Sequence, residues 1–174
     1  AKAWEEIILE EDRQKVFMGF IYPMIGLVSL AVFLGALFTH GWGGPKSFQI
    51  AMTDCCSIAI ALFGGFYLAA YILNKLVIRF FNKSDDLLSS QRLIGYSLVV
   101  VFLLQIVNGV LPSFNIVSWF LQFYTVYIVW EASSVFFKII DKDRLKFTLL
   151  ASFLLLACPL IIELLFNKLV FILN

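Results

Sequence analysis

The sequence predicts an all-α fold: a polytopic membrane bundle of five transmembrane helices with a short N-terminal amphipathic helix. Of the 174 residues, 61% are hydrophobic and only 14% are charged, whereas about 25% of the residues of a soluble domain are charged. The apolar residues form long uninterrupted stretches. The formal net charge of +1 argues against a nucleic-acid partner, because such proteins carry a strong basic excess.

Five stretches are long enough to span a membrane, which takes about 20 apolar residues for about 30 Å of hydrocarbon. The predicted spans are about 16–38, 48–73, 93–111, 116–137 and 147–169. Only "PSFN" separates the third span from the fourth. Such a short link requires the two spans to be antiparallel neighbours. We therefore expect one membrane domain over residues 1–174.

The distribution of lysine and arginine predicts the orientation. Of the 13 such residues, Lys46 and Lys168 lie on one side of the predicted spans, and the remaining eleven lie on the other. Basic residues are enriched on the cytoplasmic side of membrane proteins. We expect a cytoplasmic N-terminus and, after five spans, a C-terminus outside.

Residues 1–15 have the pattern of an amphipathic helix ahead of the first span. Trp4, Ile7 and Ile8 fall on one helical face, and acidic residues occupy most of the rest. Helices that bind membrane surfaces are usually rich in lysine and arginine. This acidic segment is expected either to lie against the protein's own basic loops or to form a solvated helical stub.

Several short motifs resemble the Yip family of Ypt/Rab-interacting-protein-like membrane proteins. They are "AWEEI" before the first span, Tyr22-Pro23, Pro112, "YTVYIVWE" in the fourth span, and Pro159. The resemblance covers nearly the whole chain. It implies five spans, a cytoplasmic N-terminus and a non-catalytic membrane role. Eukaryotic members of the family are associated with Rab GTPases and vesicle traffic in the endoplasmic reticulum and Golgi.

The Asp-Leu-Tyr-Gly-Pro motif typical of eukaryotic members does not occur in the sequence, and neither does their long hydrophilic N-terminal region. The resemblance therefore points to a bacterial member in the cytoplasmic (inner) membrane. A Rab partner is not carried over to this chain.

Glu131 is the most conspicuous polar residue within a span, where a charge costs about 2.5–3.5 kcal/mol. At 100° per residue, polar and aromatic stripes form on the third and fourth spans. The stripe residues are Ser97, Gln105 and Asn108 in the third span and Tyr124, Tyr127, Glu131 and Ser134 in the fourth. Counting outward from the short link pairs Gln105 with Tyr124 and Ser97 with Glu131, with Lys138 farther toward the cytoplasm. Glu131 either fixes the packing of these two spans, forms an ion, proton or ligand site, or faces lipid.

Two further features are predicted on the second and fifth spans. Asp54 and Glu163 lie at similar depth below the outer boundary, so they form a candidate second acidic site. Every fourth residue of one face of the second span is small, and such a series permits close helix contact. The residues of this face are Ser57, Ala61, Gly65 and Ala69.

No enzyme signature is present: the sequence has no Gly-rich phosphate loop, His-Glu-x-x-His motif or Cys-x-x-Cys pair. We expect no catalytic, cofactor or metal site. The favoured function is a non-catalytic scaffold that binds partner proteins or organises lipid, with the lipid bilayer and a possible homo-oligomer as partners. The alternative is a small transporter or channel with an ion or proton site at Glu131. Since five short spans enclose little volume, a transporter would need to oligomerise.

Overall fold

The computed structural model describes residues 17–42, 44–81, 84–137, 139 and 141–173. The predicted amphipathic helix at residues 1–15 lies outside these described residues. Within them the regular structure is entirely helical. The elements in chain order are η1 (Phe17–Ile21, a π-helical turn), α3 (Tyr22–His40), α4 (Pro45–Phe81), α5 (Leu87–Ser97), α6 (Val99–Val110), η2 (Pro112–Phe114), α7 (Asn115–Leu121), α8 (Tyr124–Phe136) and α9 (Asp141–Leu173).

Four helical segments among the described residues are long and apolar enough to cross a membrane by length and composition. They are Phe17–His40, Pro45–Phe81, Leu87–Val110 and Lys142–Ile172. These segments correspond to the first, second, third and fifth predicted spans. The membrane character and the helical class are therefore confirmed, whereas the count of five depends on the remaining stretch.

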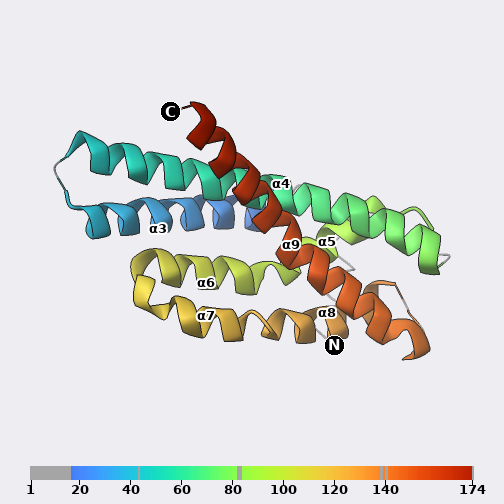
Figure 1. Ribbon diagram of the computed structural model, residues 1–174. Coiled ribbons are helices and arrows are strands. Elements are labelled where there is room, and N and C mark those ends of the chain that lie inside the picture. Colours follow the sequence, from blue (N-terminus) through green and yellow to red (C-terminus); the bar gives the residue numbers. More distant parts are fainter. Residues whose placement is uncertain (1–16, 43, 82–83, 138, 140, 174) are drawn as a thin grey trace.

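The fourth predicted span, 116–137, is divided into α7 and α8 at Gln122 and Phe123. At the division, backbone amides bond to the carbonyl three residues earlier rather than four residues earlier. The amides of Thr125 and Val126 donate to the carbonyls three residues earlier, both at 3.0 Å. This is 3₁₀ geometry, which turns more per residue than an α-helix. The chain keeps its direction, and α7 and α8 together run beside α6 (Figure 1).

The bundle has two distinct ends (Figure 1). The turns between α3 and α4 and between α6 and α7 lie together at one end, called the turn end below. The C-terminal ends of α4 and α8 and the N-terminal ends of α5 and α9 lie at the opposite end, called the link end. Helix α3 packs between α4 and α6, and α9 crosses α4 and also contacts α8.

Local chemistry explains where several helices start and stop. Helix α3 ends at His40 and is capped by Gly41, whose φ of 90° suits glycine. Pro45 begins α4, where its missing N–H costs no helical hydrogen bond. Asp86 caps α5 by accepting a hydrogen bond of 3.0 Å from the amide of Ser89. These signals set the two ends of the bundle.

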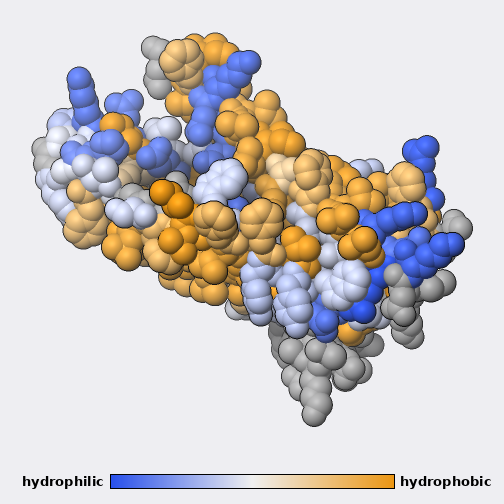
Figure 2. Space-filling view, turned by 60° about the horizontal axis from the view of Figure 1, so that its bottom comes forward, coloured by the Kyte–Doolittle hydropathy of each residue, from blue (hydrophilic) through white to orange (hydrophobic). Residues whose placement is uncertain are grey.

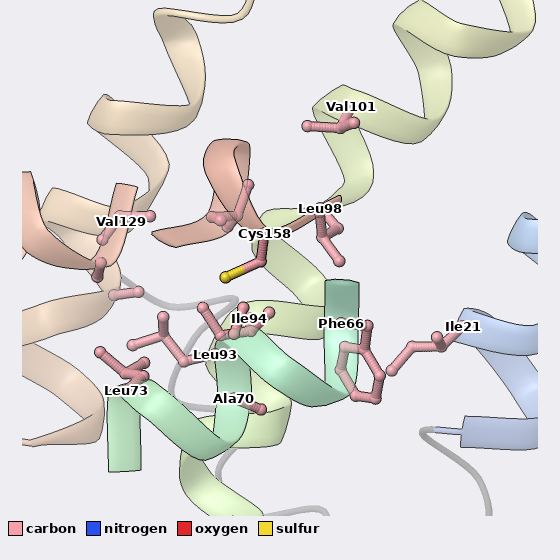
Figure 3. Packing of buried hydrophobic residues seen from close by; sticks show 14 of the residues in the cluster. Ile21, Phe66, Ala70, Leu73, Leu93, Ile94, Leu98, Val101, Val129 and Cys158 are labelled. Carbon is pink, nitrogen blue, oxygen red and sulfur yellow. The ribbon is translucent and has the colours of Figure 1, made fainter. Parts of the chain in front are cut away.

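The core consists of buried apolar side chains from η1, α3, α4, α5, α6, α8 and α9. Ile21, Phe66 and Leu98 are fully buried; Ile21 lies beside Phe66, and Leu98 lies beside Cys158 of α9 (Figure 3). The face shown in Figure 2 is also largely apolar in its middle, with most hydrophilic residues toward the two ends. Since lipid tails are as apolar as these side chains, tight packing and polar contacts, rather than burial alone, must hold the helices together.

Candidate functional site

The C-terminal part of α8 is held by Arg144 in the first turn of α9. The guanidinium donates two hydrogen bonds to the backbone carbonyl of Trp130, from Nε at 3.2 Å and from Nη2 at 2.8 Å. It also lies 4.5 Å from the centre of the Trp130 ring. The hydroxyl of Ser133 donates to the same carbonyl at 2.7 Å. Arginine therefore connects two helices through charge-assisted hydrogen bonds and a cation–π contact.

Glu131 lies beside this contact. Its Oε1 is 3.8 Å from Nη2 of Arg144, and its side chain is 34% exposed, against 16% for Arg144. The sequence pointed to Lys138 as the basic neighbour, but that residue lies outside the described residues. The structure thus supplies a cation from α9, as polar residues within membrane segments usually require.

The rest of the α8 stripe does not form one inward-facing site. Tyr124 and Tyr127 are each 56% exposed, and their ring centres are 5.6 Å apart. Ser134 donates to the backbone carbonyl of Glu131 at 3.0 Å. Among the described residues, no hydrogen bond joins Gln105 to Tyr124. The 3₁₀ turn at Gln122 supplies the physical reason, since it rotates α8 relative to an uninterrupted 100° count.

Ser97 is fully buried in α5, and its hydroxyl has no hydrogen-bond partner among the described residues. The expected pairing with Glu131 is therefore not formed. Three further hydroxyls, those of Thr125, Thr148 and Ser152, are also buried without a partner there. Buried polar groups are ordinarily hydrogen-bonded, so each of these hydroxyls would stabilise a water molecule or ion that reached it.

A lateral groove of about 710 Å³ lies between α4, α6, the α7–α8 division and α9. Its lining is mostly apolar, with polar side chains contributed by α6, α9 and the α7–α8 division. The lining residues are Ile58, Leu62, Val101, Gln105, Asn108, Trp119, Gln122, Phe153, Leu155, Leu156, Ala157, Pro159, Leu160 and Glu163. Gln105 and Asn108 from the third span therefore face the same space as Glu163, a combination that the sequence did not indicate.

Glu163 and Asp54 are close enough to interact electrostatically, across the contact of α9 with α4. Nearby, the hydroxyl of Ser57 donates to Oδ1 of Asn167 at 2.8 Å and joins the same two helices. Among the described residues, no group of three His, Cys, Asp or Glu side chains is placed to hold a metal ion.

The predicted small-residue face of α4 is buried throughout, at Ser57, Ala61, Gly65 and Ala69. Gly65 meets Pro159 of α9 so closely that an added Cβ would lie 2.6 Å from the Cα of Pro159. The neighbouring Gly64 faces only the flexible end of Ile162, at 2.9 Å. Within the bundle, this face therefore contacts α9 directly at Gly65.

A second close backbone contact was not anticipated from the sequence. Gly35 of α3 lies against the backbone of Gly109 in α6, and a Cβ at Gly109 would be 2.8 Å from the carbonyl carbon of Ala31. The available signal was the series Ala31, Gly35 and Thr39, which places a small residue at every fourth position of α3. The hydroxyl of Ser118 donates a hydrogen bond of 2.6 Å to Oδ1 of Asn108, and this bond ties α7 to α6.

Comparison with known proteins agrees with this architecture. The family model described as the Yip1 domain matches residues 1–164. No curated protein and no solved structure matches the chain. Since the match covers nearly the whole sequence, the chain belongs to the Yip1 family of membrane proteins.

Proposed function

We propose that the protein is a non-catalytic integral membrane scaffold, which binds partner proteins in the bilayer or organises the surrounding lipid. One observation carries the proposal: two pairs of helices pack so closely that their backbones are in contact. Gly35 meets Gly109 between α3 and α6, and Gly65 meets Pro159 between α4 and α9. Packed interfaces of this kind do not slide continuously, so they suit a fixed platform better than a bundle that rocks during transport.

Polar side chains support the same conclusion, because their hydrogen bonds join one helix to another. Arg144 bonds to Trp130 between α9 and α8, Ser57 to Asn167 between α4 and α9, and Tyr22 to Tyr67 between α3 and α4 at 2.8 Å. Such pairs stabilise helix association in membranes. The exposed apolar surface between the two ends (Figure 2) then remains available to lipid or to apolar segments of other proteins.

The proposed topology has five spans, with α7 and α8 together forming the fourth. The link end faces the cytoplasm of a bacterial cell, and the C-terminus lies outside. Basic side chains of the described helices support this orientation: Arg79 lies in the last turn of α4 and Arg144 in the first turn of α9, both at the link end. Reporter fusions at the two termini test it, and finding both termini on one side would contradict it.

A second function, a small transporter or channel, is favoured by the buried hydroxyls of Ser97, Thr125, Thr148 and Ser152, which lack partners among the described residues. On this alternative, the hydroxyls hold water along a path that begins at Glu131. Proteoliposomes with a panel of cation and proton gradients separate the two functions. The scaffold predicts flux no higher than in protein-free vesicles. Flux that disappears in Glu131→Gln would instead establish transport.

A further inference from the structure

We propose that the lateral groove binds one phospholipid with a primary ammonium head group, the ammonium at Glu163 and an acyl chain along the apolar part. This inference rests on the proposed scaffold function and names the lipid class that the scaffold would hold. The groove's volume of about 710 Å³ is within the range of about 300–1,000 Å³ for small-molecule sites.

The groove has a polar half and an apolar half. Helices α6 and α9 both run from the interior toward the turn end. On α6 the lining changes from Val101 to Gln105 and Asn108 in this direction, and on α9 it changes from Phe153 to Glu163. Val101 and Asn108 are separated by about 10 Å of helix rise, and Phe153 and Glu163 by about 15 Å. A groove with this gradient matches an amphiphile whose head points to the turn end.

The polar half is placed where lipid head groups lie. Asn108 is in the last turn of α6, just before the α6–α7 turn. Trp119 lines the same half and is 64% exposed, and tryptophan side chains concentrate at membrane–water interfaces. A phospholipid in the adjacent leaflet can therefore enter from the side without moving its head out of the interface.

Charge selects an ammonium head. Glu163 lines the groove, and a cation bound beside this carboxyl group favours its charged form. A primary ammonium carries three N–H donors, as lysine does, and can bond to the carboxylate and to the amide oxygen of Gln105. A trimethylammonium head has the charge but no N–H donor. The amide N–H groups of Gln105 and Gln122 suit the phosphate and ester oxygens of the same lipid.

Trp119 provides the probe for a test. The full chain with Trp4→Phe, Trp42→Phe and Trp130→Phe retains only this tryptophan, and the backbone carbonyl at position 130 is unchanged. This variant is reconstituted in phosphatidylcholine nanodiscs. One sample contains a minor fraction of phosphatidylethanolamine with brominated chains, and the other contains the same fraction of phosphatidylcholine with brominated chains. We expect stronger fluorescence quenching by the brominated phosphatidylethanolamine, and loss of that difference in Glu163→Gln.

Glu131→Gln is the matched control, since it removes a glutamate charge at the link end and should keep the difference. Ala157→Phe fills the groove and should weaken quenching by both lipids. Equal quenching by both lipids, or a difference that survives Glu163→Gln, would overturn the proposal. So would a cross-linkable dimer without lipid selectivity, because a second copy would then occupy the groove. Vesicle flux would refute the scaffold alone, whereas absent lipid selectivity would refute the lipid site alone.

Discussion

The guanidinium of Arg144 donates two hydrogen bonds, of 3.2 and 2.8 Å, to the backbone carbonyl of Trp130 and lies against its ring. The acceptor is the main-chain oxygen of residue 130, which is present whatever side chain stands at that position. Substitution of Arg144 is therefore the way to remove these hydrogen bonds between α9 and α8.

Arg144→Ala should lower the free energy of unfolding by about 2–3 kcal/mol, because hydrogen bonds to charged groups contribute about 1.5–3 kcal/mol. Arg144→Lys should lie between the wild type and Arg144→Ala, since lysine keeps the charge but lacks the planar fork. Unfolding by sodium dodecyl sulfate in mixed micelles measures both. Lys146→Ala, an exposed position in the same helix, serves as the control. Equal stability of Arg144→Ala and Lys146→Ala would contradict the assignment.

Glu131→Gln should cost no more than about 1 kcal/mol, because partly exposed ion pairs contribute about 0–1 kcal/mol. The reason is geometric: Arg144 bonds directly to the Trp130 carbonyl, and Glu131 lies farther away, at 3.8 Å. The same mixed-micelle unfolding curve gives the answer. A loss as large as that of Arg144→Ala would show that the carboxylate, not the carbonyl, anchors the arginine.

Gly65→Ala should destabilise the protein by about 1–3 kcal/mol, the usual cost of overpacking, because the new methyl group would strike the backbone and ring of Pro159. Gly64→Ala is the matched control on the adjacent residue. The atom nearest to its methyl group is the terminal Cδ1 of Ile162, at 2.9 Å, and this end of the side chain can rotate away. Alanine also favours a helix over glycine by about 1 kcal/mol, so Gly64→Ala should be neutral or stabilising. Equal effects of the two substitutions would refute the close crossing of α4 and α9 at Gly65.

Gly35→Ala and Gly109→Ala should each separate α3 from α6, because each new methyl group would meet the backbone of the facing helix. The double variant should cost less than the sum of the two, since the first methyl group has already opened the contact that the second would break. Gly26→Ala in α3 is the control, because among the described residues no other helix comes within 4 Å of its added Cβ. Strict additivity would place the two glycines in separate contacts.

Ser57 and Asn167 should show a coupling energy of about 0.6 kcal/mol, and at most about 1.7 kcal/mol, in a double-mutant cycle with alanine. The 2.8 Å hydrogen bond between their side chains crosses from α4 to α9. Unfolding of the wild type, the two single variants and the double variant completes the cycle. A coupling energy of zero would mean that the bond does not form in the bilayer.

The sequence indicated some features of the candidate sites but not their partners. The small-residue face at Ser57 and Gly65 follows from a four-residue repeat on one helix, and the contact with α9 occurs on that face. Glu131 was recognisable as a polar residue needing a partner. Its basic neighbour, Arg144, belongs to a different helix, and periodicity within one helix carries no information about another.

The helical class and the membrane character follow from the amino-acid sequence alone, because a chain in lipid must satisfy its backbone hydrogen bonds within each segment. Which helix faces meet depends instead on the folded arrangement. The rotation of each helix is set by contacts between distant residues, such as Gly35 with Gly109 and Gly65 with Pro159. It also depends on the 3₁₀ turn at Gln122, which changes the direction of every later side chain in α8. Those non-local contacts bring Gln105, Asn108 and Glu163 to one groove.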